Sequence, residues 1–206
     1  QDQRYGYRMT PSPVDPQLRL DQRTGWPEEL RHLLLRYPRE VWTGHANLGQ
    51  MAQFWLDRHN MFRELTQSLL QATHALREGH VPPDQFRQWF APRMNFLLGE
   101  LQGHHMIEDQ HYFPVFVQAE KSLVKGFDIL ENDHEMIHHG LEDLARAAQM
   151  LAGAIDGDTP LVMKASDGFA DVTDGFLKIL RQHLDDEEDL IIPVILDRTE
   201  AGLGIR

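Results

Sequence analysis

Residues 104–114 read HHMIEDQHYFP, and a second segment of the same pattern, HLDDEEDLIIP, occupies residues 183–193. Each segment has a histidine, a glutamate four residues later and a proline six residues after the glutamate. A spacing of four places two side chains on one face of an α-helix, about 6 Å apart along its axis. The repeat therefore predicts two helices that each present a histidine and a carboxylate to one metal site.

Each repeat segment is preceded by a helical stretch with a leading histidine, HNMFREL from His59 and HEMIHHGL from His134. The chain thus reads as two helix hairpins related by a pseudo-twofold axis, with ligands contributed symmetrically. The symmetry fails at His138, which pairs with His134 at a spacing of four but corresponds to Arg63 in the first hairpin. Three histidines would then serve one metal ion and two the other, which leaves the second ion an open position.

Four long helical patterns cover most of the chain. Apolar residues recur at spacings of three and four in segments 46–78, 83–118, 122–152 and 159–189. No segment shows sustained strand-like alternation. Pro92 is expected to break or kink the second helix, and Thr159 as N-cap with Pro160 at the first helical position marks the start of the fourth. The links are short, so the expected fold is all-α, an antiparallel four-helix bundle.

The first part of the chain differs in character. Residues 1–27 hold four of the eleven prolines and show little apolar periodicity, so we expect an extended arm over the domain surface. A short amphipathic helix is expected at residues 28–37. We therefore divide the chain into a Pro-rich arm with a short helix, residues 1–41, and a metal-binding bundle, residues 42–206.

The apolar stripe of each helix is interrupted near its middle by histidine or glutamate, at positions that should face the core. An unpaired ionised carboxylate is costly there, and metal explains two buried glutamates among histidines. The candidate ligands are His59, His104, Glu108, His134, His138, His183 and Glu187. The repeat register favours His104 over His105 and Glu187 over Glu188. We expect His105, His111 and Glu188 to lie beside the ligands or to act as alternates, with His111 otherwise partly buried. The rest of the acidic run 185–189 reads as a solvated face.

The composition limits the chemistry further. The chain lacks cysteine, which excludes disulfides, iron–sulfur clusters and thiolate zinc sites, and fits a reducing, cytoplasmic compartment. With 12 histidines, imidazole is the available neutral ligand. The formal net charge of −12 opposes binding to nucleic acid, and no apolar run is long enough to span a membrane.

Two other kinds of metal site fit less well. A ferritin-like carboxylate bundle needs Glu-x-x-His on two helices and a lone glutamate on each of the others. That motif begins at Glu108, Glu131 and Glu135 but is absent from the fourth helix. Structural zinc takes four ligands in a closed tetrahedron, whereas seven candidate ligands suit two five- or six-coordinate ions.

The order H … HxxxE … HxxxH … HxxxE on four helices resembles the hemerythrin-like (HHE cation-binding) family, over residues 42–196. The resemblance implies a four-helix bundle with a non-haem di-iron centre. The ligands that it implies are His134, His138 and His183 for one iron, His59 and His104 for the other, and Glu108 and Glu187 as bridges. The iron with two histidines would be five-coordinate and would bind dioxygen or a similar small ligand.

The sequence departs from the invertebrate oxygen carriers of that family in two ways. Their last motif is His-x4-Asp, whereas Glu187 and Glu188 lie four and five residues after His183, so either could bridge. The chain is also longer, which argues against a plain transport role. We expect a protein that binds or senses dioxygen, nitric oxide or iron status. The alternatives are a di-iron oxidase or peroxidase for stress protection and a purely structural metal bundle.

Overall fold

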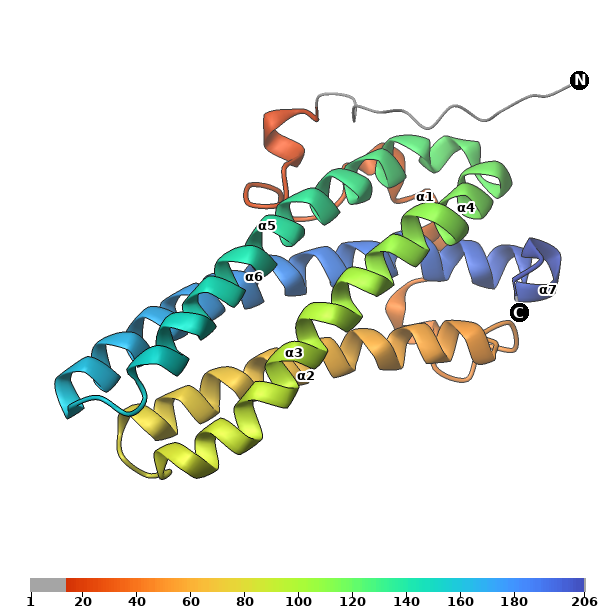
Figure 1. Ribbon diagram of the computed structural model, residues 1–206. Coiled ribbons are helices and arrows are strands. Elements are labelled where there is room, and N and C mark those ends of the chain that lie inside the picture. Colours follow the sequence, from red (N-terminus) through yellow and green to blue (C-terminus); the bar gives the residue numbers. More distant parts are fainter. Residues whose placement is uncertain (1–13, 206) are drawn as a thin grey trace, which may run out of the picture.

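The computed structural model describes residues 14–205, and within that range the chain is helical and has no strand (Figure 1). The long helices are α2 (Gln50–Arg77), α3 (Pro83–Ile107), α5 (Val124–Ala154) and α6 (Thr159–Arg198). A π-helical turn, Glu108–Tyr112, joins α3 to α4 (Phe113–Ala119). The short helices are α1 (His32–Arg36) and α7 (Glu200–Leu203), and 3₁₀ turns occupy Pro16–Leu18, Glu28–Leu30, Arg39–Val41 and Lys121–Leu123.

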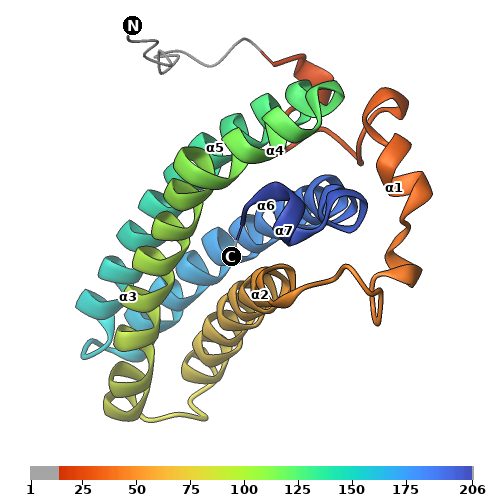
Figure 2. The same ribbon diagram turned by 90° about the vertical axis from the view of Figure 1, so that its right-hand side faces the viewer.

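The helices α2, α3–α4, α5 and α6 form the antiparallel four-helix bundle that the sequence predicts. Helix α6 has the most extensive contacts, with α5 and α2 on either side of it. Figure 2 shows α6 enclosed by these helices and by the segment that carries α1. Gly79 ends α2 with a φ of +73°, a left-handed conformation that glycine adopts without steric cost.

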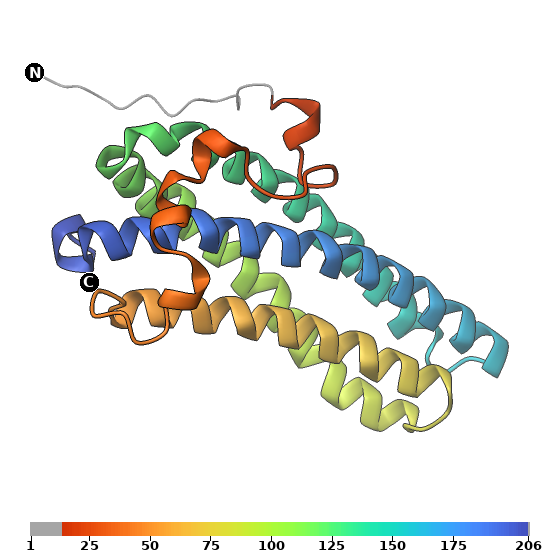
Figure 3. The same cartoon turned by 180° about the vertical axis from the view of Figure 1, so that it is seen from behind.

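The segment before α2, residues 14–49, lies across the outer side of α6, as Figure 3 shows. Its buried side chains include Trp26, Leu33 and Trp42, which pack in the same apolar cluster as residues of α6. The Trp26 indole donates a hydrogen bond of 2.7 Å to the Asp186 carbonyl of α6. This part of the predicted arm is therefore packed into the bundle, and the part before residue 14 lies outside the described residues.

The sequence predicts a break or a kink at Pro92 and an N-cap at Thr159. Pro92 lies inside α3, which excludes the break. It is exposed, and so is Gln88, whose carbonyl loses its helical partner and can bind water instead. Asp158, not Thr159, caps α6, with its carboxylate accepting a hydrogen bond of 3.0 Å from the Leu161 amide.

The core consists of two apolar clusters with a polar band between them. On α2, Trp55 belongs to one cluster and Phe62 to the other, and buried His59 lies between them along the helix. On α5 the same order places buried His134 between Leu130 and Ile137. The interrupted stripes therefore become a polar layer in the middle of the bundle.

Candidate metal centre

The polar band brings together two groups of side chains that can ligate a metal. The first group is His105, His134 and His183, and the second is His59, His104, Glu108 and Glu187. Within each group one ligand atom from every residue lies within 4.8 Å of the others. The residues come from α2, from α3 and the π-helical turn after it, from α5 and from α6, so all four long helices of the bundle contribute.

The two glutamates face both histidine groups. Each carboxylate points one oxygen towards a histidine of the first group and the other towards a histidine of the second. The shortest approaches of carboxylate oxygens to Nε2 atoms are Glu108 Oε1 to His104 at 2.7 Å, Glu108 Oε2 to His134 at 3.5 Å, Glu187 Oε1 to His59 at 3.4 Å and Glu187 Oε2 to His183 at 3.2 Å. This orientation is the one that a carboxylate needs to bridge two ions.

Most of these inward-facing atoms have no hydrogen-bond partner. Among the described residues, the buried side-chain atoms without a partner are Nε2 of His105, His134 and His183, both carboxylate oxygens of Glu108, Oε2 of Glu187 and, away from the site, Oγ of Ser166. Buried polar atoms are normally paired, because an unpaired buried carboxylate is costly. Lone pairs that converge in this way fit bound cations, and imidazole is a ligand for iron, zinc, copper and nickel.

The other ring nitrogen of three candidate ligands contacts a carboxylate. The pairs are His59 Nδ1 with Glu188 Oε1 at 3.0 Å, His134 Nδ1 with Asp109 Oδ1 at 2.8 Å, and His183 Nδ1 with Asp133 Oδ2 at 3.2 Å. A carboxylate acceptor keeps the proton on Nδ1, so the Nε2 lone pair is free for a metal. Sequence reasoning missed Asp109 and Asp133, although each directly adjoins a candidate ligand in the sequence.

Burial and neighbouring charges shift pKa values within the site. Desolvation, aided by the neighbouring imidazoles, lowers the pKa of His105 well below its ordinary value. Burial also opposes protonation of His183, but Asp133 and Glu187 outweigh it and raise the pKa of His183 to about 9. Burial favours the neutral form of Glu187, yet His59 and His183 hold its pKa well below the usual range. His183 would therefore have to lose a proton to bind a metal.

The structure does not bring His138 into either group, which differs from the prediction. The His138 side chain is 49% exposed, with Nε2 3.6 Å from a carboxylate oxygen of Glu142. His105, only 6% exposed, stacks on His134 instead, with ring centroids 4.0 Å apart. The repeat predicts one inward-facing histidine at the start of each repeat segment. In the structure α3 supplies two, His104 to the second group and His105 to the first.

His111 is exposed, although it was expected beside the ligands or partly buried. The π-helical turn explains this, because one extra residue in the turn rotates the following face by about 100°. Phe113 and Phe116 occupy the core, each one residue later than Tyr112 and Val115, the positions that continue a spacing of four and three after Glu108.

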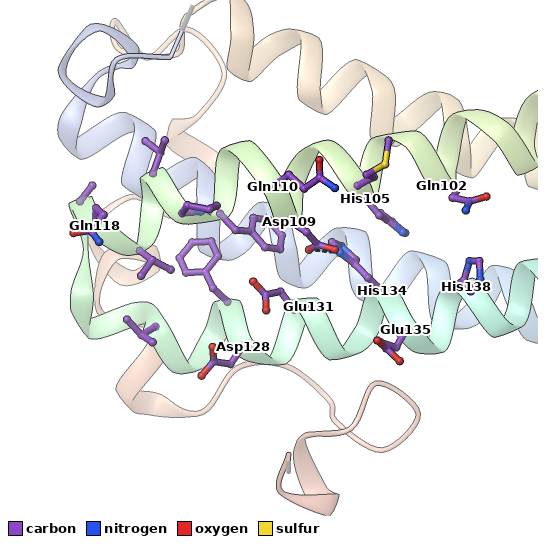
Figure 4. A pocket seen from close by; sticks show the side chains of 18 of the residues that line it. Gln102, His105, Asp109, Gln110, Gln118, Asp128, Glu131, His134, Glu135 and His138 are labelled. Atoms are coloured by element: carbon purple, nitrogen blue, oxygen red, sulfur yellow. Dashed lines mark hydrogen bonds and ion pairs between the residues drawn. The ribbon is translucent and has the colours of Figure 1, made fainter. Parts of the chain in front are cut away.

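Two openings reach the centre from outside. A pocket of about 350 Å³ between α2 and α3 ends at His104 and Glu108. Gly99 and Gly103 line it, and a Cβ atom at either position would meet nothing within 4 Å. A groove of about 1500 Å³ beside α3, α4 and α5 reaches His105 and His134. Figure 4 shows Asp109 beside His134 in this groove, and His138 farther along α5.

A helical bundle with histidines and carboxylates gathered in its core is a metal-binding architecture. The family model of the hemerythrin HHE cation-binding domain matches residues 50–195, and the chain belongs to this family of metal-binding proteins. Searches of curated proteins and of solved structures returned no match. None of the described helices combines the length and the apolarity that crossing a membrane requires.

Proposed function

We propose that the chain holds a non-haem di-iron centre that binds or senses dioxygen or a related small ligand such as nitric oxide. The observation that carries this proposal is the orientation of Glu108 and Glu187, each with one oxygen towards each histidine group. One ion among the second group would leave Oε2 of Glu108 and Oε2 of Glu187 without a partner. One ion among the first group would leave Glu108 Oε1 without one, whereas two ions use all of these oxygens.

The proposal assigns one iron to three histidines and the other to two. The ligands would be His105, His134 and His183 for the first iron, His59 and His104 for the second, and Glu108 and Glu187 as bridges. The second iron would keep an open position for the small ligand. The absence of cysteine fits a cytoplasmic location for such a centre.

The pocket between α2 and α3 supports access of a small ligand to the second iron. It is lined by His104, and Trp55 and Tyr112 contribute aromatic surface to it. The Trp55 indole donates a hydrogen bond of 2.9 Å to Glu187 Oε1, which fixes the orientation of that carboxylate. Bound iron would supply the redox chemistry, and the protein would hold the ligands in place around it.

Elemental analysis combined with an optical spectrum tests the proposal. Protein loaded with ferrous iron should contain about two irons per chain, and exposure to oxygen should produce a charge-transfer band that disappears on deoxygenation. Protein that holds at most one iron in the presence of excess metal would contradict the di-iron centre. A centre with two irons that responds to neither oxygen nor nitric oxide would contradict the binding or sensing role.

A di-iron oxidase or peroxidase is the second candidate function. The groove beside α3, α4 and α5 favours the oxidase, because about 1500 Å³ has room for a substrate larger than a diatomic ligand. Steady turnover of peroxide by the iron-loaded protein, lost in His59→Ala, would support this enzyme over a reversible binding protein. A purely structural centre would need no openings, and iron-loaded protein inert to every small ligand would be its signature.

Removing the metal should lower the melting temperature by about 8–16 °C. Metal at roughly a thousand times its dissociation constant stabilises the folded state by about 4 kcal/mol, and 1 kcal/mol shifts the melting temperature of a domain of this size by about 2–4 °C. Differential scanning calorimetry of metal-free and Zn²⁺-loaded protein measures the difference. Equal melting temperatures would show that the folded protein gains nothing from metal.

Metal loading should release protons, and fewer of them as the pH rises. The pKa of His183 is about 9 in the metal-free protein, so this imidazole is protonated at pH 7 and must lose its proton to bind a metal. We expect the number of protons released per Zn²⁺ to fall between pH 7 and pH 9.5. A pH indicator in weakly buffered solution counts them, and a constant number over this range would contradict the assignment.

A further inference from the structure

A buried ion network connects the segment before α2 with a candidate ligand of the first group. Arg23, whose side chain is 1% exposed, donates from Nη1 to Asp133 Oδ1 at 2.9 Å and from Nε to Asp186 Oδ2 at 2.6 Å. Its Nη2 also donates to Asp133 Oδ2, so the Arg23–Asp133 contact is bidentate. Asp133 in turn contacts His183 Nδ1 at 3.2 Å.

A second network of the same design leads from this segment to the second group. Arg39 donates from Nη1 to Glu188 Oε2 at 3.0 Å and from Nη2 to the Asp185 carbonyl at 2.8 Å. Glu188 Oε1 lies 3.0 Å from His59 Nδ1. Arg63 of α2 also contacts Glu188 Oε1, at 2.9 Å, so two arginines hold this carboxylate.

In both networks a buried carboxylate connects an arginine with a candidate histidine ligand. Asp133 and Glu188 are buried, and each lies between a guanidinium group and the Nδ1 atom of a histidine. Each carboxylate is therefore held by an arginine in the place where it accepts the Nδ1 proton of a histidine. An acceptor that is lost or displaced would free the imidazole to rotate or to change its tautomer.

We propose that Arg23 and Arg39 are positioning residues of the metal centre. Through Asp133 and Glu188 they fix the orientation of one candidate ligand in each group, so the segment before α2, which precedes the family match at residues 50–195, completes the site. The inference rests on the proposed function only in that the centre binds metal. Because coupling between two sites is reciprocal, metal bound at the centre also holds this segment more firmly against α6.

Binding of Co²⁺ tests the inference, with Arg36→Gln as the matched control. Arg36 belongs to α1 and contacts Asp197 of α6 at 3.2 Å, in a pair that touches no candidate ligand. We expect Arg23→Gln to weaken Co²⁺ binding by about 10–100-fold, the usual effect of losing a group that orients a ligand. Arg39→Gln should weaken it measurably but less, because Arg63 still holds Glu188. Arg36→Gln should bind Co²⁺ as tightly as the unaltered chain. Chelator competition measures the affinities.

Three further measurements separate positioning from general stability. The Co²⁺ absorption spectrum of Arg23→Gln should change in shape, and Arg23→Lys, which keeps one charged donor, should recover part of the affinity. Arg39 is 42% exposed, so Arg39→Gln keeps the inference testable if Arg23→Gln does not fold. Hydrogen exchange at residues 19–39 should slow when metal binds the unaltered chain.

The outcomes distinguish this inference from the proposed function. Arg23→Gln and Arg39→Gln proteins that bind Co²⁺ with the affinity and spectrum of Arg36→Gln would overturn the inference. A chain that binds Co²⁺ as expected but forms no di-iron centre would contradict the proposed function and leave the positioning role intact. An unaltered chain that binds no metal would overturn both.

Discussion

Replacing His105 with alanine is expected to remove one of two bound metal ions, whereas His138→Ala should leave the metal content unchanged. His105 Nε2 is buried without a hydrogen-bond partner and faces the ligand atoms of His134 and His183. Its loss reduces the first group to two histidines, and we expect the affinity for that ion to fall by at least about 100-fold. His138 is half exposed and interacts with Glu142, so its loss removes no ligand.

Elemental analysis of both variants after gel filtration measures this contrast, with circular dichroism as the check that each is folded. His105→Ala should retain about one ion per chain and His138→Ala about two. The reverse result would support the ligand set that the sequence pattern favours, in which α5 provides His134 and His138. The variants thus decide between the geometry of the structure and the symmetry of the repeat.

The fold could be predicted from the sequence because its main signal is repeated in every helix. Apolar spacing of three and four, interrupted by His59, His134 or His183, requires a helix with a polar site in its buried face. Four such helices with short links leave few arrangements besides an antiparallel bundle. The family resemblance rests on the same residues, and the family match agrees with it.

The ligand position of His105 and the exposure of His111 could not be predicted in the same way. Adjacent residues of a helix point about 100° apart, so periodicity selects either His104 or His105 and not both. The structure uses both because two groups of ligands lie side by side across the face of α3. The π-helical turn that follows has no sequence signature that we recognise, and it moves His111 out of the core.

The role of Asp186 and the arginine partners of Glu188 also escaped the sequence analysis. An acidic run on a helix is usually solvated, and only the phase of Glu187 marked it as buried. The structure buries Asp186 and Glu188 as well, against Arg23 and Arg39 from the segment before α2. Such long-range partners follow from how the chain crosses α6, which no local pattern encodes.

Replacing Glu187 with alanine should remove both ions. The carboxylate is fully buried, with Oε1 3.4 Å from His59 Nε2 and Oε2 3.2 Å from His183 Nε2. Its loss takes one ligand atom from each ion and half of the negative charge that Glu108 and Glu187 supply to the centre. Asp185→Ala is the matched control, because it removes the same charge from an exposed position of the same acidic run.

Metal content and Co²⁺ affinity of the two variants measure this effect. Glu187→Ala should bind less than one ion per chain under conditions in which Asp185→Ala binds two. Retention of two ions by Glu187→Ala would mean that this carboxylate does not bridge. Glu188, which the sequence left open as a bridge, would then be the carboxylate to test, although in the structure Arg39, Arg63 and His59 Nδ1 contact its oxygens. Because these partners hold Glu188 on the outer side of His59, we expect Glu187 to be the bridge.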